Sequence, residues 1–297
     1  MSFVSHSLLS RRSFLAVAAA GVLAPAETPA AQPPAFIPGI HLHSVDVELK
    51  RDFEGTLRRL AEMGYRHVEL ADLHGKSAAA WGKALKAAGL SALSAHYAVH
   101  TLQYDFDTTL DFAREIGLKY MVCAYPRASN GVCPSFEEWK WNAGFLNTIG
   151  FLTARAGIRF GYHNHAIEFI RTPAGRGRFR TGFDELIEGT DPKLVTFQLD
   201  CGWAAAARLD PAQLLADHKA RFTLLHVRDV APVQKTNPAQ PFRTTAVGQG
   251  ALDWKAILTA AHASGVQETF VALEPGPADA LALLQQSAAF LIRTRYE

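Results

Sequence analysis

Side chains of the types that bind metal ions recur at the ends of apolar segments along this 297-residue chain. They are imidazoles and carboxylates, and each lies in or just after a run of residues with the character of a buried β-strand. Groups of these types can hold a divalent cation or exchange protons with a bound substrate. The candidates are Glu69, His96, His163, His165, Glu168, Asp200, His226 and Glu274.

The number of these groups favours a metal site over a set of separate structural roles. A single His or Asp at a strand end is more often a helix cap or a hydrogen-bonded structural group. Several ionisable groups buried around one axis repel one another and lose hydration, at a cost on the order of several kcal/mol. A bound cation offsets that cost, and a mixed set of His and carboxylate ligands suits Mn, Co, Zn or Fe better than Ca. We therefore predict one divalent metal ion as the cofactor.

A repeating order of helix, glycine and short apolar strand surrounds the candidates. Gly89, Gly117 and Gly265 come where helices are expected to end in a left-handed residue. This repeat predicts the α/β class and a single (β/α)8 TIM barrel over residues 39–297, with a last helix over about 278–295. An open, doubly wound sheet is the rival fold, but no glycine-rich phosphate loop follows the first strand. The expected strands lie near 37–43, 65–71, 90–97, 118–124, 158–164, 194–200, 222–228 and 268–274.

Two stretches break this repeat. Residues 172–181 are rich in Gly and Arg, and residues 231–250 are rich in Pro, Gln and Thr. Both follow strands, so we expect both to lie over the face of the barrel where the strands end. Active sites of such barrels lie on that face, which is also where the candidate side chains are expected to gather.

The first 30 residues have the pattern of an export signal rather than of a folded element. Arg11 and Arg12 precede Ser-Phe-Leu, an apolar run too short to span a bilayer, and the small-residue sequence Ala-Pro-Ala at 24–26. The paired arginines predict the twin-arginine export machinery as a partner and a periplasmic or secreted location, with an ordinary secretory signal as the alternative. We expect no stable membrane anchor after signal removal, and a linker over residues 31–38.

The charge balance speaks against several classes of partner. If cleavage follows Ala26, two arginines and no acids are lost, so 30 − 2 = 28 basic residues stand against 28 acidic ones. The chain also has no run of five or more like charges, and we expect no nucleic-acid partner. Cys123, Cys133 and Cys201 lack metal-ligand spacing and are expected to be packing residues, with a Cys123–Cys133 bridge as the alternative.

The chain resembles the sugar phosphate isomerase/epimerase family within the xylose isomerase-like TIM barrel superfamily, over nearly all of residues 39–294. The resemblance implies a metal held by Asp200, His226 and Glu274, which match the last three of the four ligands of relatives. Counting six residues from Gly157, where relatives place a glutamate, gives His163 as the fourth ligand, with Glu168 as the substitute. The segments that carry the resemblance are DFEGTL (52–57), GYHNHAIEF (161–169), LDCGW (199–203), HVRD (226–229) and VGQGALDW (247–254).

The resemblance further implies an isomerase or epimerase that acts on a small sugar or keto-sugar through an enediolate. The metal polarises a carbonyl and its adjacent hydroxyl, and Glu274, His165, Glu168 or His96 removes the neighbouring proton. Export argues against a phosphorylated substrate. Epimerases of this family use two metal-bound glutamates as opposing bases, and only one is kept here. A keto-sugar lyase or dehydratase of the inosose dehydratase type is therefore the alternative.

Three further residues are expected to contact the substrate: Glu69, Trp203 and Arg228. Core packing is the alternative role for Trp203, and pairing with Asp229 or Glu274 is the alternative for Arg228. From another class, a periplasmic sugar-binding protein without turnover is a second alternative to the isomerase. The near-neutral charge speaks against an abasic-site endonuclease, and the sequence leaves an oligomer open.

Overall fold

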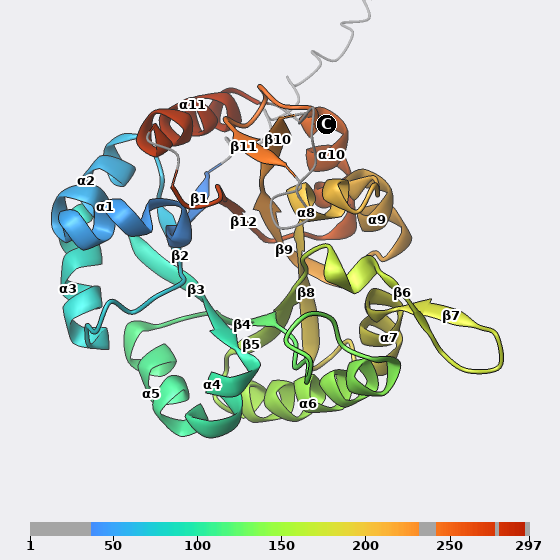
Figure 1. Cartoon of the computed structure of the whole chain (residues 1–297). Helices are drawn as coiled ribbons and strands as arrows, with labels where there is room; N and C mark the ends of the chain where they lie inside the picture. Colours follow the sequence, from blue (N-terminus) through green and yellow to red (C-terminus); the bar gives the residue numbers. More distant parts are fainter. Residues whose placement is uncertain (1–36, 232–241, 277–278, 295–297) are drawn as a thin grey trace, which may run out of the picture. The chain divides into compact units, whose positions relative to one another are not determined.

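A closed barrel of eight parallel strands forms the centre of the computed structural model, which describes residues 37–231, 242–276 and 279–294 (Figure 1). Each predicted strand overlaps one barrel strand, with β3 and β4 ending one residue later than predicted, and the predicted (β/α)8 barrel is confirmed. In order around the barrel the strands are β1 (Gly39–His41), β2 (His67–Leu70), β3 (Ser91–Ala98), β4 (Tyr120–Tyr125), β5 (Arg159–His163), β8 (Val195–Asp200), β9 (Phe222–Val227) and β12 (Glu268–Val271).

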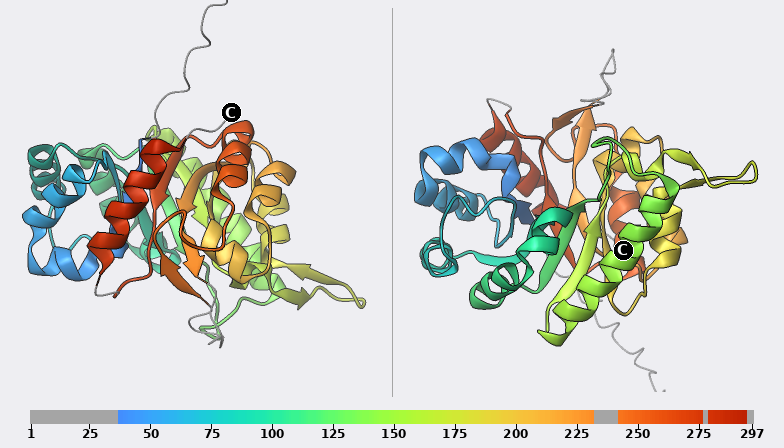
Figure 2. Two further views of the ribbon diagram at one scale, coloured as in Figure 1. Left: turned by 90° about the horizontal axis from the view of Figure 1, so that it is seen from above. Right: turned by 60° about the horizontal axis from the view of Figure 1, so that its bottom comes forward.

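Helices cover the outside of the barrel (Figures 1 and 2). The predicted last helix is present as α11. The α-helices are α1 (Asp46–Arg51), α2 (Phe53–Glu62), α3 (Ala78–Ala88), α4 (Val99–Tyr104), α5 (Phe106–Ile116), α6 (Phe136–Arg155), α7 (Gly182–Gly189), α8 (Cys201–Ala206), α9 (Pro211–Asp217), α10 (Trp254–Ser264) and α11 (Ala280–Arg293). Two short 3-10 helices, η1 (Leu42–Val45) and η2 (Ile167–Phe169), follow β1 and β5.

The chemistry of the helix ends explains where the helices begin and end. Gly89 and Gly117 end α3 and α5 in the left-handed conformation, with φ of 74° and 81°, which a residue without Cβ adopts at no steric cost. Ser135 begins α6 with a capping box that it forms with Glu138, and the Asp253 side chain accepts a hydrogen bond from the Ala256 N–H at the start of α10. The glycine pattern of the sequence is therefore a pattern of helix ends.

The interior of the barrel changes from apolar to polar along the strands. Leu93, Tyr120, Val122, Leu224 and Phe270 form one buried apolar cluster inside it. Because side chains alternate between the two faces of a strand, the residue two positions further along also faces inward. On β9 that step leads from Leu224 to His226, so the polar groups lie toward the carboxyl ends of the strands.

The two stretches that break the repeat form short hairpins in part. The first contains most of the hairpin of β6 (Arg171–Pro173) and β7 (Phe179–Thr181), which extends outward from the side of the barrel (Figures 1 and 2). The expectation that it lies over the catalytic face is therefore wrong, because the paired strands direct it away from the axis. In the second stretch β10 (Asp229–Ala231) pairs with β11 (Arg243–Thr245), and residues 232–241 lie outside the described residues.

Several predictions concern residues that the structure does not describe. The expected signal peptide (1–30) and most of the expected linker (31–38) lie outside the described residues, so both stay predictions. Within the described ranges, no helix has the length and apolar character needed to cross a membrane. Cys123, Cys133 and Cys201 are free thiols, so the alternative of a Cys123–Cys133 bridge is not seen.

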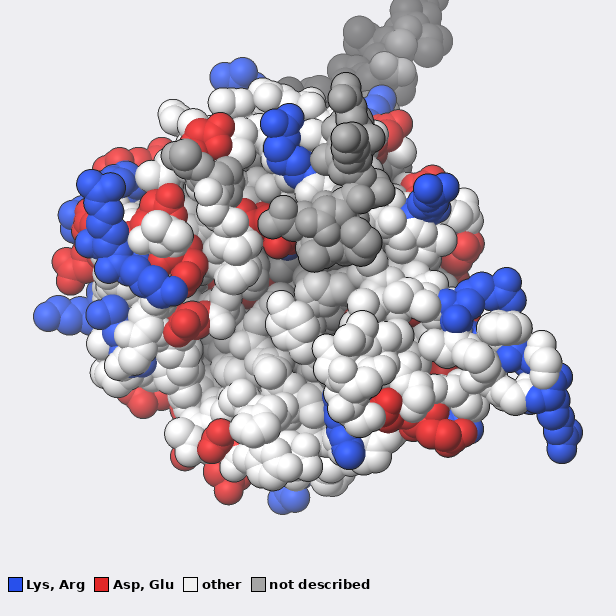
Figure 3. Space-filling model, viewed as in Figure 1, with Lys and Arg blue, Asp and Glu red and all other residues white. Residues whose placement is uncertain are grey.

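Charged side chains lie mainly around the edge of the barrel face shown in Figure 3. Lys and Arg alternate there with Asp and Glu, and the centre of the face is mostly uncharged.

Candidate active site

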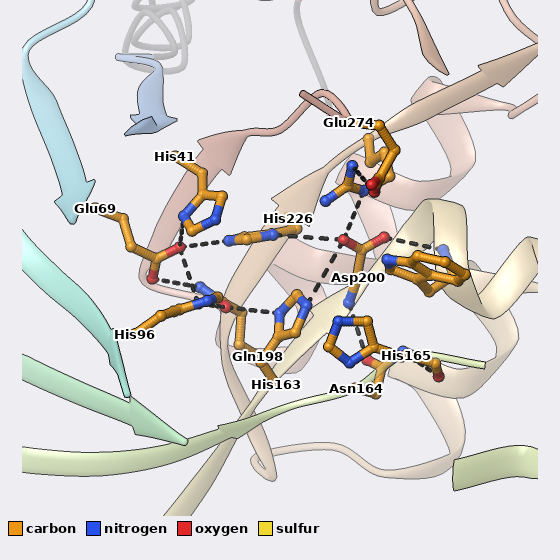
Figure 4. Close-up of polar contacts among 12 residues, drawn as sticks. His41, Glu69, His96, His163, Asn164, His165, Gln198, Asp200, His226 and Glu274 are labelled. Atoms are coloured by element: carbon orange, nitrogen blue, oxygen red, sulfur yellow. Dashed lines mark hydrogen bonds and ion pairs between the residues drawn. The ribbon is translucent and has the colours of Figure 1, made fainter. Parts of the chain in front are cut away.

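Polar side chains from six strands converge inside the carboxyl end of the barrel (Figure 4). Each faces inward because it occupies the inward register of its strand. All but His96, which is one-tenth exposed, belong to the buried class. The members of this polar ring are His41 on β1, Glu69 on β2, His96 on β3, His163 on β5, Gln198 and Asp200 on β8, and His226 on β9.

Glu69 lies at the centre of one side of the polar ring. Its Oε2 atom is 3.0 Å from His41 Nδ1, 3.1 Å from His96 Nε2 and 2.5 Å from His226 Nε2. Burial alone would raise the pKa of Glu69, but the charges of His96 and His226 hold it well below its ordinary value. Glu69 is therefore an ionised carboxylate within a group of imidazoles.

Gln198 connects Glu69 to His163. Its Nε2 donates to Glu69 Oε1 at 2.8 Å, and Ser94 Oγ donates to the same oxygen at 2.7 Å. Gln198 Oε1 lies 2.8 Å from His96 Nε2 and 2.9 Å from His163 Nδ1. An amide oxygen only accepts hydrogen bonds, so it favours the His163 tautomer with the proton on Nδ1. That tautomer leaves a lone pair on His163 Nε2.

Asp200 lies on the other side of the polar ring, at the end of β8. Its Oδ1 caps α8 by accepting from the Trp203 N–H at 2.9 Å, and its Oδ2 accepts from Arg228 Nε at 2.8 Å. The same Oδ2 is 3.4 Å from His226 Nδ1 and 4.0 Å from His163 Nε2. Burial would raise the pKa of Asp200, but Arg228 and His226 lower it below its ordinary value.

His163, Asp200 and His226 are arranged as a set of metal ligands. Their ligand atoms all lie within 4.8 Å of one another. Tetrahedral zinc bonds of about 2.0–2.2 Å place neighbouring ligand atoms about 3.4 Å apart. Asp200 Oδ2 lies at that distance from His226 Nδ1, and His163 Nε2 is 4.0 Å from the same oxygen. His226 Nδ1 is buried and has no hydrogen-bond partner. The donor set, its spacing and this unbonded nitrogen fit a divalent ion.

His226 connects the two sides of the polar ring through its two nitrogens. Nε2 faces Glu69, and Nδ1 faces Asp200. Burial lowers the pKa of His226, but the two carboxylates raise it above its ordinary value. A hydrogen bond from Nε2–H to a carboxylate leaves Nδ1 free for a metal, as in the carboxylate–histidine–metal arrangement of many metalloproteins.

A cavity of about 530 Å³ opens beside the polar ring, over the ends of β1 to β4. His41, His43 and His96 line it together with Tyr97 and Tyr125. None of the described residues that line it is a lysine or arginine. Next to it, the ring of His165 stacks on Tyr125, with ring centres 4.8 Å apart, and lies 4.9 Å from the ring of His163.

The sequence of this chain also matches a known protein family. Residues 57–294 match the model of the xylose isomerase-like TIM barrel family. This chain belongs to the xylose isomerase-like TIM barrel family. It is an enzyme of that superfamily, and the sequence-based assignment is confirmed.

The relatives within this superfamily have two kinds of activity. An inosose dehydratase of Geobacillus thermodenitrificans is 27% identical over 249 residues, which cover 74% of this chain and 80% of that protein. One of Clostridium botulinum is 24% identical, with coverage of 63% and 66%. Among solved structures, a sugar phosphate isomerase/epimerase of Parabacteroides distasonis superposes with a TM-score of 0.73 at 24% identity, covering 91% of this chain and 98% of that one. The IolI protein with a bound zinc atom has a TM-score of 0.62 at 15% identity, covering 86% and 94%.

Within this barrel, three of the four predicted metal ligands come together and the fourth does not. Glu274 follows β12, its side chain is 43% exposed, and Arg228 Nη1 donates to its Oε1 at 2.6 Å. Arg228 thus bridges Asp200 and Glu274. The predicted pairing of Arg228 with Glu274 is present, and its predicted substrate contact stays a prediction.

Glu168, the substitute ligand and candidate base, lies away from the metal-ligand set. It is fully buried, and its carboxylate accepts from the Tyr162 hydroxyl at 2.6 Å and from the His165 N–H at 2.8 Å. Burial raises the pKa of Glu168 to about 7. Glu168 therefore holds the turn after β5 and positions His165.

His165 and Trp203 form a wall beside Asp200. Their ring centres are 5.4 Å apart, and Trp203 also packs edge-on against Phe242 at 4.8 Å. Burial lowers the pKa of His165 to about 4, so this imidazole is neutral at pH 7 and can accept a proton. Both residues lie beside the metal-ligand set, and their expected roles as base and substrate contact stay predictions.

Three members of the site were missed in the sequence: His41, His43 and Gln198. His41 lies within the first predicted strand, and its neighbour His43 follows at the spacing of one strand face. Gln198 lies two residues before Asp200 and so shares its inward face. Alternation along the predicted strands could have identified all three.

Asp229 has a structural role that the HVRD segment did not reveal. Its carboxylate accepts hydrogen bonds from the N–H groups of Gly248 and Gly250, both at 2.9 Å. A Cβ at Gly250 would lie 2.1 Å from Asp229 Oδ1, so only glycine allows this approach. Asp229 thus holds the VGQG turn against β10.

Proposed function

We propose that this enzyme is a metal-dependent lyase that removes water from a small, non-phosphorylated keto-sugar. The convergence of His163, Asp200 and His226 on one position is the observation that carries the proposal. When bound there, a divalent ion would supply Lewis-acid chemistry to a substrate carbonyl and its adjacent hydroxyl. The inosose dehydratases among the relatives support elimination as the reaction class.

His165 is the residue best suited to remove the proton next to the carbonyl. Its neutral imidazole lies beside His163 and Trp203. A neutral imidazole in that setting can accept a proton from carbon when a substrate is held against Trp203. His96, which lines the cavity, can donate a proton to the β-hydroxyl as its C–O bond breaks, so that this group leaves as water.

The environment of Glu274 favours elimination over epimerisation. An epimerase of this family needs two opposed glutamates, and here the Glu274 carboxylate is paired with Arg228 at 2.6 Å. Proton return to carbon is nevertheless a second candidate reaction. His96 and His165 lie on different sides of His163, with ring centres 4.8 Å and 4.9 Å from it, so two imidazoles could serve as bases.

A neutral substrate agrees with the charges around the cavity. Phosphate groups are bound by arginine, lysine or helix N-termini, and the described lining contains neither cationic side chain. Arg228 is engaged by two carboxylates. The predicted export signal, which rests on residues outside the described ranges, is consistent with a non-phosphorylated substrate, and we propose the periplasm as its location.

The proposal is tested on the purified protein after loading with Zn, Mn or Co. Keto-inositols and keto-glycosides are screened for ultraviolet absorbance of the enone product and, in D2O, for deuterium uptake next to the carbonyl. We expect elimination that falls at least 100-fold in Asp200→Ala, which removes a ligand, and in His165→Ala, with His100→Ala as an exposed control. Deuterium uptake without enone indicates an epimerase. Full metal content and activity in Asp200→Ala would contradict the proposed site.

A further inference from the structure

We propose a second divalent-metal site on the cavity side of the polar ring, formed by His41 Nδ1, Glu69 Oε2 and His96 Nε2. Ligand atoms of His41, Glu69, His96 and His226 lie within 4.8 Å of one another, and the first three of these residues come from β1, β2 and β3. The proposal goes beyond the reaction proposed above, because its ligands are separate from His163, Asp200 and His226.

The spacing of the three atoms suits a transition metal. Glu69 Oε2 is 3.0 Å from His41 Nδ1 and 3.1 Å from His96 Nε2, close to the roughly 3.4 Å edge of a tetrahedron with zinc bonds of about 2.0–2.2 Å. Two imidazoles and one carboxylate are also the ligand set of many catalytic zinc sites, which keep a fourth position open. The donor types exclude a preference for calcium, which favours all-oxygen shells.

His41 provides an independent indication of a missing ligand. Its side chain is buried, and its Nδ1 has no hydrogen-bond partner although Glu69 Oε2 is only 3.0 Å away. Glu69 Oε2 is shared among three imidazole nitrogens, so this contact does not give His41 Nδ1 a hydrogen bond of its own. Buried ring nitrogens are rarely left unbonded, and a cation held between the two atoms would satisfy both.

The hydrogen bonds around the three residues allow both sites to be filled together. His226 Nε2–H can donate to Glu69 Oε2 while that oxygen also binds a cation, and its Nδ1 still faces Asp200. If His96 Nε2 binds a metal, its proton resides on Nδ1. Gln198 Oε1 then loses one hydrogen bond but keeps the one from His163 Nδ1. The two sites are thus compatible and are joined through the His226–Glu69 hydrogen bond.

The open side of the second site faces the place where a ligand can enter. His41 and His96 line the 530 Å³ cavity, whereas Glu69 is fully buried behind them. A cation here could bind a second oxygen of a polyol or keto-sugar whose carbonyl lies at the first site. Paired metals commonly bind two oxygens of one substrate in this way. The structure thus assigns to this half of the cavity the recognition of a vicinal oxygen.

The test is metal stoichiometry, measured on the full chain by elemental analysis after loading with Co and dialysis. We expect two Co per chain in the unchanged protein. We expect about one in His41→Ala and in the closer mimic His41→Gln, and about one in His163→Ala. His100→Ala, an exposed histidine, should keep both, and circular dichroism checks that each variant is folded. The Co absorbance lost in His41→Ala should differ from that lost in His163→Ala, because the ligand sets differ.

The outcomes separate this proposal from the proposed function. One Co per chain that is lost in His163→Ala and kept in His41→Ala and His41→Gln would overturn the second site and leave the first intact. One Co that is lost in His41→Ala and kept in His163→Ala would overturn the first site and support the second. A content of two that neither His41 variant lowers would overturn the second site as assigned here.

Discussion

On one side of the polar ring Glu69 is surrounded by three imidazoles, and on the other side Asp200 and Glu274 are bridged by the guanidinium of Arg228. Imidazoles can lose a proton near neutral pH and then bind a metal, whereas a guanidinium stays charged and offers no lone pair. The Glu69 side can thus exchange protons for a cation. The Asp200 side has a fixed positive charge next to its carboxylate.

Removing that fixed charge should have the largest effect on stability. Arg228→Met leaves the buried carboxylate of Asp200 without its guanidinium, and breaking a buried pair costs about 3–5 kcal/mol. We expect the free energy of unfolding in EDTA to fall by about that amount. Excess Zn should restore about 2–3 kcal/mol, because a ligand at about 100 times its dissociation constant stabilises the folded state to that extent. Chemical denaturation with and without metal measures both effects, and a variant as stable as the unchanged protein in EDTA would contradict the comparison.

Glu168 gives a third environment for a buried carboxylate, because its hydrogen bonds come from neutral donors. Its folded pKa of about 7 lies above its ordinary value of 4.5, so the folded state binds the proton more tightly. Stability from this group is full below pH 4.5 and is lost as the pH rises toward 7, by about 3 kcal/mol in total. Glu168→Gln should remove this loss. Denaturation curves of both proteins at pH 5 and pH 7.5 test it, and parallel pH profiles would show that the group does not titrate in this window.

Neutralising Glu69 tests the imidazole side directly. Glu69→Gln keeps the shape of the side chain but removes the charge that His226 Nε2–H faces, and losing such a partner typically lowers metal affinity about 10- to 100-fold. Competition with a chelator, in a His41→Ala background that lacks the proposed second site, measures the dissociation constant of the metal at His163, Asp200 and His226. Glu62→Gln, exposed on α2, is the matched control. Equal affinity in Glu69→Gln and the control would mean that Glu69 does not position His226.

The smallest effect is expected outside both sides of the polar ring. Asp253→Ala removes the N-cap of α10, where the carboxylate accepts from the Ala256 N–H at 3.0 Å, and caps are worth about 1 kcal/mol. We expect the free energy of unfolding, measured by thermal denaturation, to fall by about 1 kcal/mol, and the metal content to stay unchanged. A change in metal content would show that α10 influences the site and that the two sides cannot be treated separately.

The fold could be predicted from the sequence further than the site could. Apolar strands and helix-ending glycines are local signals, so the eight strands were placed within a few residues. The site depends on which side chains meet across the barrel. The contacts of Glu69 with His41, His96 and His226 depend on side-chain directions and strand register. The same holds for the link that Gln198 makes between Glu69 and His163. Strand-end positions alone do not contain that information.

The part of the polar ring that contains Glu69, His41 and His226 has a consequence for how the chain folds. His41 comes from the first strand of the barrel, Glu69 from the second and His226 from the seventh, which is β9. The group therefore joins residues up to 226 − 41 = 185 positions apart. A half-barrel fragment lacks at least one of these three residues. A folding intermediate with an open seam between β1 and β12 contains all three but does not bring them together. A cation at the proposed second site would therefore bind tightly only to the closed barrel. Metal uptake would therefore report closure of the barrel. It would also make the two halves of the chain fold and unfold as one cooperative unit.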